Sequence, residues 1–228
     1  MTLNKEPLPP AGTLPKGRFM KLLVLLLGML VLVPLLEEIF QVQALGEFFF
    51  SAVIGYAAYS CNRNRRLLAA AVALGVPAIA SMWLKRFGQS KWLSVSGDLC
   101  GMAFVALIVV AILVFIFQQE DINADTIAGA IVAYLLMALM WSLVYGVVEA
   151  LHPGSFQFPP GTSHSGQEVF TYFSFATITT VGYGDIVPLT LVARSFSNLE
   201  SIVGQLYLVV LVAWLVGMYV SARSRRRP

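Results

Sequence analysis

Long runs of apolar residues follow one another along the chain, and short polar segments separate them. Several runs reach or approach the roughly 20 residues that a helix needs to cross the hydrocarbon core of a membrane. The pattern predicts six membrane-spanning helices, which cover residues 19–36, 48–60, 67–84, 93–117, 126–151 and 199–221. The second run is short and Pro34 interrupts the first, so the pattern defines the existence of these helices more firmly than their ends.

The composition agrees with a protein that lies in a membrane. Of the 228 residues, 58% are hydrophobic and 12% are charged, and the mean hydropathy is +0.78. Soluble globular proteins carry about twice that share of charged residues, so the expected class is an all-α integral membrane protein in contact with lipid. The net charge of +3 comes from residues that flank the apolar runs, and it does not indicate a nucleic-acid partner.

Basic residues predict the orientation of the chain in the membrane. If the amino terminus is cytoplasmic and all six runs cross, eleven basic residues fall in cytoplasmic segments and four in external ones. Cytoplasmic loops are enriched in Lys and Arg, so we expect a multi-pass protein of the cell membrane with a cytoplasmic tail at 1–18, a cytoplasmic linker at 118–125 and a basic cytoplasmic end at 223–228. A cleaved signal peptide over residues 16–44 is the alternative, but two glutamates interrupt that stretch and its removal leaves an odd number of spans.

The segment between the last two runs is neither a short turn nor a soluble domain. Residues 152–166 are rich in Pro, Gly and Ser, which is typical of an exposed loop. Residues 167–179 form an aromatic and apolar stretch that is too short to cross a membrane, and TTVGYGDIVP follows at 179–188. Non-helical backbone is tolerated at membrane depth only where protein buries it or an aqueous path runs beside it. We therefore expect a re-entrant half-helix followed by an extended strand.

The glycine pattern of this stretch suits a strand that binds a cation through its backbone. A potassium ion that crosses the bilayer exchanges its water for other oxygens, and rings of backbone carbonyls replace that shell. Successive carbonyls point the same way only if the backbone alternates between conformations, some of which are open mainly to glycine. Gly182 and Gly184 occupy alternate positions, and Thr180 adds a hydroxyl oxygen. Val181 and Tyr183 are expected to point away from the axis and to pack behind the strand.

The stretch SFATITTVGYGDIVP, at 174–188, resembles the pore helix and selectivity filter of the tetrameric potassium channels. The resemblance covers about 126–221. It implies a pore domain at 126–222 that consists of an outer helix at 126–151, a pore helix at 167–179, a filter at 180–185 and an inner helix at 199–221.

The same resemblance implies a role for each residue of the filter region. Potassium is implied to bind in a filter formed by Thr180, Val181, Gly182, Tyr183 and Gly184, at the carbonyls of the first four and at the Thr180 hydroxyl. Support of the filter is implied for Asp185, Thr179 and Tyr172. One chain supplies one strand of such a filter, so the resemblance implies a homotetramer. The implied function is passive flow of K⁺, without a chemical reaction and without an organic cofactor.

A glycine that bends the inner helix is implied at Gly204, nineteen residues after Asp185. The alternative interpretation is a small residue that lets the inner helix approach a neighbour closely, as small residues do in membranes. Gly217 is a second candidate for the same roles.

The first four predicted helices, at 19–117, resemble a voltage sensor only in number. A voltage-sensing helix is rich in arginine, whereas the run at 93–117 contains Asp98 as its single charged residue. Arg63, Arg65 and Arg66 lie in a loop, where topological anchoring explains them. We therefore expect no steep voltage gating, and a scaffold and a sensor of lipid or tension are both open as roles for these helices.

Two other functions are open at this level. Glu149 and His152 form an E-x-x-H pair that, with His164, Glu37 and Glu38, is a candidate for the metal site of an intramembrane hydrolase. Both histidines lie in or beside the exposed loop, and the sequence contains no H-E-x-x-H element. The other function is a pore subunit that is silent or regulatory without a partner.

Side chains near the candidate filter have further interpretations. Glu168 and Glu200 either flank the outer mouth, where negative charge raises the local cation concentration, or are simply solvated at helix ends. An aromatic cuff around Tyr183, rather than a cofactor site, is expected from Tyr172, Phe173 and Phe175.

Overall fold

The computed structural model describes residues 17–40, 48, 51–53, 55–56, 65–84, 91–119, 123–159 and 166–225. Most of these residues are helical and form α1 (Arg18–Phe40), α3 (Arg65–Leu84), α4 (Lys91–Phe117), α5 (Ala124–Leu151), α6 (Gln167–Ile178) and α7 (Leu191–Arg225). Two short strands, β1 (Phe156–Gln157) and β2 (Val187–Pro188), form an antiparallel pair.

Five of the described helices are long and apolar enough to cross a membrane. Their apolar segments are Arg18–Leu36, Leu67–Leu84, Lys91–Phe117, Ala124–Leu151 and Leu191–Met218. The predicted class, an all-α multi-pass membrane protein, is therefore confirmed. The second predicted run, at 48–60, lies partly outside the described residues, and so do nearly all of the predicted tail at 1–18 and residues 226–228 of the basic end.

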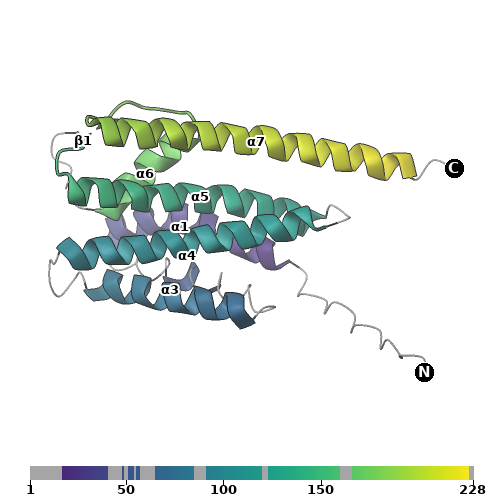
Figure 1. The fold of residues 1–228 in the computed structure, drawn as a ribbon, viewed down its shortest axis with the longest axis horizontal. Helices are drawn as coiled ribbons and strands as arrows, with labels where there is room; N and C mark the ends of the chain where they lie inside the picture. Colours follow the sequence, from purple (N-terminus) through teal and green to yellow (C-terminus); the bar gives the residue numbers. More distant parts are fainter. Residues whose placement is uncertain are drawn as a thin grey trace, which may run out of the picture.

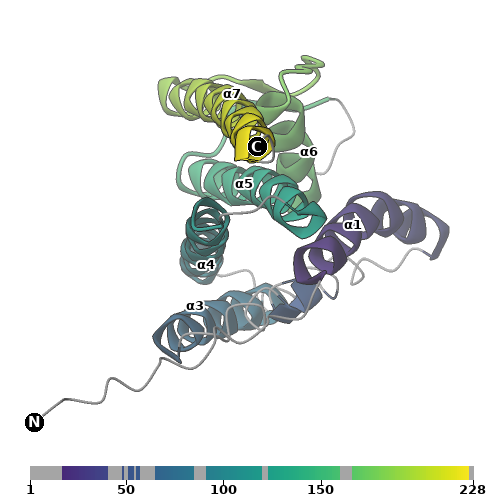
Figure 2. The same cartoon turned by 90° about the vertical axis from the view of Figure 1, so that its right-hand side faces the viewer.

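The helices stack side by side around α5 (Figures 1 and 2). α5 contacts α4 and α1 on one side and α6 and α7 on the other, and α3 packs against α4. α1, α3 and α5 run in one direction along the bundle, while α4 and α7 run in the opposite direction (Figure 1). The start of α1 and the end of α7 therefore lie at the same end of the bundle.

Small side chains allow α5 to occupy this central place. Its buried residues include Ala128, Ala130, Val132, Ala133, Ala138 and Leu139. At Gly129, a Cβ atom would lie 3.0 Å from the ring of Phe19, so the glycine lets α1 approach closely. Small residues at helix contacts are the usual means of close packing in membranes.

The start of α5 is fixed by polar side chains of the preceding linker. The Asn123 side chain accepts a hydrogen bond from the Thr126 N–H at 2.9 Å, as a helix cap does. Asp125, in the first turn, accepts hydrogen bonds from the N–H groups of Phe19 and Met20 at 3.0 and 3.1 Å. Asp125, one acidic side chain in the first turn of α5, therefore joins the start of α1 to the start of α5.

α7 is longer than the inner helix predicted at 199–221. It starts at Leu191, where the Thr190 hydroxyl oxygen accepts a hydrogen bond from the Ala193 N–H at 3.3 Å, and it continues to Arg225. The apolar run fails to predict the first two turns because they contain Arg194, Ser195, Ser197 and Asn198. The earlier start moves every later residue deeper into the helix than the sequence suggests.

Candidate functional site

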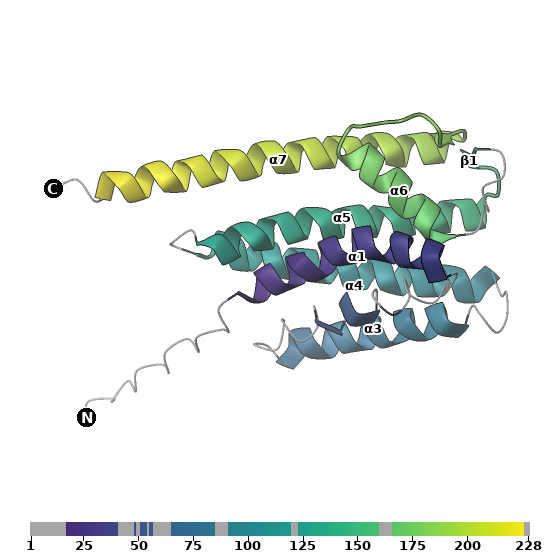
Figure 3. The ribbon, with the colours of Figure 1, turned by 180° about the vertical axis from the view of Figure 1, so that it is seen from behind.

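α6 is a short helix that ends inside the bundle. It lies beside α5 and α7 and runs obliquely from one towards the other, and the chain then returns to the end of the bundle from which α6 started (Figures 1, 2 and 3). Thr179 closes the helix, because its N–H donates to the Phe175 carbonyl at 3.2 Å and its hydroxyl donates to the same oxygen at 2.5 Å. The chain therefore enters and leaves this region on one side.

The backbone after α6 alternates in conformation. The φ angles of Thr180, Gly182 and Gly184 are 61°, 56° and 81°, and those of the residues between them are not positive. Within the described part of the chain, Thr180 is the only residue other than glycine with a positive φ. A strand needs alternation of this kind to aim successive carbonyls to one side. The structure shows it at Thr180 as well as at the two glycines.

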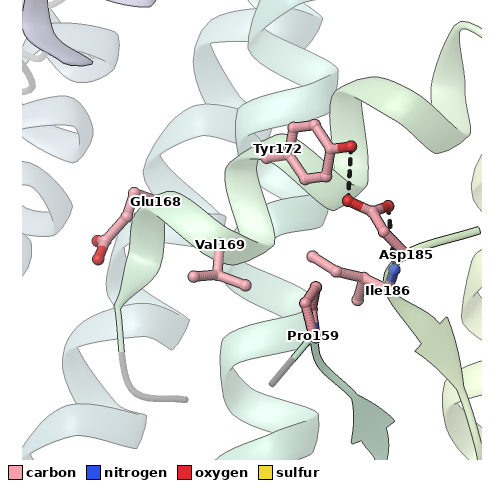
Figure 4. A pocket seen from close by; sticks show the side chains of 6 residues that line it. All are labelled: Pro159, Glu168, Val169, Tyr172, Asp185 and Ile186. Atoms are coloured by element: carbon pink, nitrogen blue, oxygen red, sulfur yellow. Dashed lines mark hydrogen bonds between the residues drawn. The ribbon is translucent and has the colours of Figure 1, made fainter. Parts of the chain in front are cut away.

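Three described hydrogen bonds fasten this strand to α6, and the first joins the Thr180 N–H to the Thr177 carbonyl at 3.0 Å. The Gly182 N–H donates to the Ala176 carbonyl at 3.1 Å, and the Tyr172 hydroxyl donates to the Asp185 carboxylate at 2.8 Å (Figure 4). The rings of Tyr172 and Tyr183 are stacked, with centroids 6.0 Å apart and planes 7° apart. The position of the strand therefore depends on the position of α6.

The environment of Tyr172 keeps its hydroxyl in the protonated, donating form. Desolvation, the hydrogen bond to Asp185 and the charge of that carboxylate raise the pKa of Tyr172 to about 12. Asp185 also accepts a hydrogen bond from the Ile186 N–H at 3.0 Å. The carboxylate thus links the outer end of the strand to the helix behind it.

A second set of contacts holds the inner end of α6. The Tyr134 hydroxyl of α5 donates to the Ile178 carbonyl at 2.9 Å, which satisfies one of the carbonyls left free at a helix end. The Tyr134 ring stacks on that of Tyr207, whose hydroxyl donates to the Ala130 carbonyl at 2.6 Å. Side chains of α5 and α7 therefore fix the point where α6 ends and the strand begins.

Comparison with known proteins agrees with this geometry. Residues 167–221, which contain α6, the strand and most of α7, match a family described as "Ion channel". The chain is also similar to two pore potassium channel c of Oryza sativa subsp. japonica, with 34% identity over 88 residues that make up 38% of this chain and 19% of that protein. These matches show a similarity to ion channels at 167–221 and a partial similarity to a potassium channel of the pore-loop class.

Each match covers only part of this chain. The chain spans about a fifth of the length of its rice relative. No solved structure matches it.

Gly204 marks a close contact between α7 and α6. A Cβ atom at Gly204 would lie 2.6 Å from Ile178 Cγ1 and 2.9 Å from the Ile178 carbonyl oxygen. α7 continues through this position as one helix. The close contact with Ile178 explains why position 204 needs a small residue. A hinge at Gly204 stays a prediction. At Gly217 a Cβ atom would meet nothing within 4 Å.

Glu200 lies in the protein interior, which corrects both interpretations made from the sequence. Its side chain is 0% exposed, so it neither faces the outer mouth nor is solvated at a helix end. Ser174 of α6 and Tyr145 of α5 donate hydrogen bonds to its two carboxyl oxygens. Because α7 starts at Leu191, Glu200 sits in the third turn. Glu168 remains exposed in the first turn of α6.

The aromatic residues of α6 divide between two environments, which corrects the expected cuff. Among the described contacts of the Tyr183 ring, the partner is Tyr172 alone. Phe173 instead lies in the core, with its ring centroid 5.0 Å from that of Tyr145 and 5.4 Å from that of Phe156. Val181 and Tyr183 are 53% and 71% exposed in the single chain, so the chain itself does not cover them.

A small cavity opens behind the outer end of the strand. It has a volume of about 280 Å³ and is lined by Pro159, Glu168, Val169, Tyr172, Asp185 and Ile186. Figure 4 shows the Glu168 carboxylate turned away from the Asp185 carboxylate. The two acids therefore do not converge on one bound cation.

Among the candidates for a hydrolase site, the structure describes the side chains of Glu149 and His152, and both have roles at the end of α5. Glu149 accepts hydrogen bonds from the N–H groups of Gly154 and Phe156 at 2.7 and 3.1 Å, so it fixes the loop after α5. His152 is the C-cap residue of α5. No group of three metal-binding side chains occurs among the described residues, and His164 and the side chains of Glu37 and Glu38 lie outside them.

Several residues that shape this site were not predicted. Four hydroxyl groups in apolar stretches form hydrogen bonds that the sequence does not indicate; they belong to Tyr134, Tyr145, Ser174 and Tyr207. A charged residue inside an apolar run is the one available signal. Glu200 carries that signal, and its partners follow only from the structure.

Proposed function

We propose that four copies of this chain form a potassium-selective pore that conducts K⁺ passively across the cell membrane. The alternating backbone at Thr180, Gly182 and Gly184 carries this proposal. A strand of this kind, tied to a short helix that ends inside a membrane bundle, suits the replacement of a cation's water by backbone carbonyls. No chemical reaction and no organic cofactor are needed for that function.

Each part of the proposed filter has a distinct task. The carbonyls of Thr180, Val181, Gly182 and Tyr183, with the Thr180 hydroxyl, bind the ion as it passes. Gly184 completes the strand and supplies its last left-handed position. Asp185, Tyr172 and Thr179 support the strand from behind. The negative end of the α6 dipole, at Ile178, favours a cation at the inner mouth.

Uncovered apolar surface supports a homotetramer. Only 6% of the most apolar window of α7 is buried by the chain itself, against 67% for α5. Ile202, Leu206 and Val209, which follow one another on one helical face, are exposed. Neighbouring copies around a central axis would cover this face and the side chains of Val181 and Tyr183, and four strands complete a ring of carbonyls.

The direction of the helices supports the proposed topology. α1 begins and α7 ends at one end of the bundle, and α6 starts from the other end (Figure 1). We place the first of these ends in the cytoplasm, where the basic residues of the flanking segments agree with the positive-inside rule. α1 and α3 run in the same direction, which supports a further crossing at 48–60 and six spans in total.

The helices before the pore domain are proposed as a scaffold rather than a voltage sensor. α4 carries Lys91 at its start and the buried Asp98, and it contains no arginine. Moving charge through the membrane field is what makes opening depend steeply on voltage. We therefore assign residues 19–117 no strong voltage response.

Ion flux from liposomes tests the proposed function. The full chain is purified, its oligomeric state in detergent is measured by native mass spectrometry, and uptake of K⁺ and of Na⁺ is compared under matched gradients. A tetramer with potassium uptake many-fold above sodium uptake, blocked by barium, is the expected result. Equal uptake of both ions, or a monomer without flux, contradicts the proposal.

A further inference from the structure

A buried acid joins the three helices that surround the candidate filter. Glu200 lies on α7, whose most apolar segment is long enough to span a membrane, and its side chain is fully buried. Acidic side chains in such helices are costly, and they are by default candidates for a function. In the described part of the chain, two hydroxyl groups bond to Glu200 and no basic side chain pairs with it.

Both partners of Glu200 come from other helices. The Ser174 Oγ of α6 lies 2.5 Å from Glu200 Oε1 and 2.7 Å from the Ala138 carbonyl oxygen of α5. The Tyr145 hydroxyl of α5 bonds to Glu200 Oε2. The Tyr145 ring is fixed in turn by the ring of Phe173. The carboxyl group is thus the polar joint between α5, α6 and α7.

The hydrogen bonds of this joint, between Glu200, Ser174 and Tyr145, can form with two arrangements of protons. A hydroxyl group has one proton to donate and can also accept. When Ser174 donates to Glu200, the carboxylate accepts from both hydroxyl groups. When Ser174 donates to Ala138, its oxygen accepts from a donor at position 200, which a protonated carboxyl or an amide supplies. Both arrangements use the same contacts, so the joint requires hydrogen-bonding capacity at position 200 and not a negative charge.

The joint is close to the parts that hold the filter strand. Ser174 lies two residues before Ala176, whose carbonyl accepts the Gly182 N–H. One turn further along α7, Gly204 packs against Ile178 at the end of α6. α7 therefore holds α6 at two successive points, and a displacement of α6 moves the strand that is fastened to it.

We propose that Glu200 is a positioning residue for the selectivity filter. Through Ser174 and Tyr145 it fixes α6, and thereby the strand at 180–184, by hydrogen bonding rather than by its charge. This inference rests on the proposed function, because it assigns a residue that sets the selectivity of the proposed pore.

Two substitutions at Glu200 separate hydrogen bonding from charge. In Glu200→Gln the amide donates to Ser174 and accepts from Tyr145, so we expect a K⁺/Na⁺ flux ratio within about twofold of the wild type. In Glu200→Leu both bonds are lost and two buried hydroxyl groups lose a partner, so we expect the ratio to fall at least about tenfold. The full-length variants are assayed in liposomes, after native mass spectrometry has shown whether each forms a tetramer.

A second pair of variants tests the joint if Glu200→Leu does not assemble. Ser174→Ala removes the link between α6 and Glu200, and we expect the flux ratio to fall about threefold or more. Ser201→Ala is the matched control, since the bond described for the Ser201 hydroxyl goes to the Ser197 carbonyl of its own helix, at 3.1 Å. We expect the wild-type ratio from that control.

The outcomes separate the inference from the proposed function. Equal losses in Glu200→Gln and Glu200→Leu contradict hydrogen bonding as the mechanism and indicate that the charge itself acts. Wild-type selectivity in a tetrameric Glu200→Leu, or in Ser174→Ala, contradicts the positioning role. A wild-type protein that does not prefer K⁺ contradicts the proposed function itself, before any variant is compared.

Discussion

Thr180 has a backbone conformation that residues with a side chain seldom adopt, with φ at 61°. A left-handed non-glycine residue costs of order 1–3 kcal/mol, and it persists where its surroundings hold it in place. Here Thr180 is held by its N–H bond to the Thr177 carbonyl and by the attachment of Gly182 to Ala176. The sequence predicted the alternation at the two glycines, but a threonine gives no such signal, so its extension to position 180 required the structure.

The next left-handed position, Gly182, gives a direct test of the strand. In Gly182→Ala the new methyl group meets no atom within 4 Å of its own chain, so the effect comes from the φ of 56°. That conformation costs a side-chain-bearing residue roughly 1–2 kcal/mol, and we expect potassium flux to be abolished. Gly28→Ala is the control, because its Cβ atom meets only Leu32 Cδ1, at 3.9 Å, inside α1. Wild-type flux and selectivity in Gly182→Ala would remove the filter assignment.

Tyr172 tests the outer attachment of the same strand. Tyr172→Phe keeps the stacked ring and removes the hydroxyl that donates to Asp185 at 2.8 Å. Loss of this bond weakens the hold on the strand by about 1 kcal/mol. We expect potassium current to decline faster during steady recording in planar bilayers. Unchanged decline in the variant would show that Asp185 does not need this support.

At the scale of elements, apolar runs predicted the spanning helices well but not their ends. The ends depend on polar side chains such as Asn123 and Thr190, which cap α5 and α7. The predicted start of the last helix at residue 199 makes Glu200 its second residue, where solvation is expected. Because α7 starts at Leu191, Glu200 instead lies in the third turn, where α5 and α6 cover it. β1 and β2 have two residues each, too few for an alternating pattern to predict.

The contact between α1 and the linker predicts a purely structural variant. Asp125→Ala removes the acceptor for two N–H groups at the start of α1. Loss of a helix cap costs about 1 kcal/mol, so we expect a lower midpoint of thermal unfolding in detergent and an unchanged K⁺/Na⁺ flux ratio. Asp125→Asn retains an acceptor and should lose less stability. A changed flux ratio would instead indicate that α1 takes part in conduction.

At the scale of the whole molecule, the bundle contains two regions with different surfaces. α5 is largely covered by its own chain, whereas few residues in the most apolar part of α7 are buried by the chain itself. The apolar residues of that surface suit a contact with a neighbouring subunit as well as a contact with lipid. The candidate filter is the reason that we propose a tetramer, since one strand cannot surround an ion.

The absence of arginine from α4 predicts how the proposed channel responds to voltage. We expect that replacing Arg63, Arg65 and Arg66 together by glutamine leaves the conductance–voltage curve nearly unshifted. The structure places Arg65 and Arg66 in the first turn of α3 rather than in a loop. Arginines at the end of a span anchor topology and do not cross the membrane field. A large shift along the voltage axis would assign a sensing role to the helices before the pore domain.

The central claim is that this chain forms a potassium-selective pore, and the reversal potential of its current tests that claim most directly. The full chain is inserted into a planar bilayer with K⁺ on one side and Na⁺ on the other at equal concentration. Selective binding of K⁺ by the backbone of residues 180–183 predicts a reversal potential far from zero, in the direction set by potassium flow. A reversal potential near zero, from a conducting and tetrameric protein, would contradict the account.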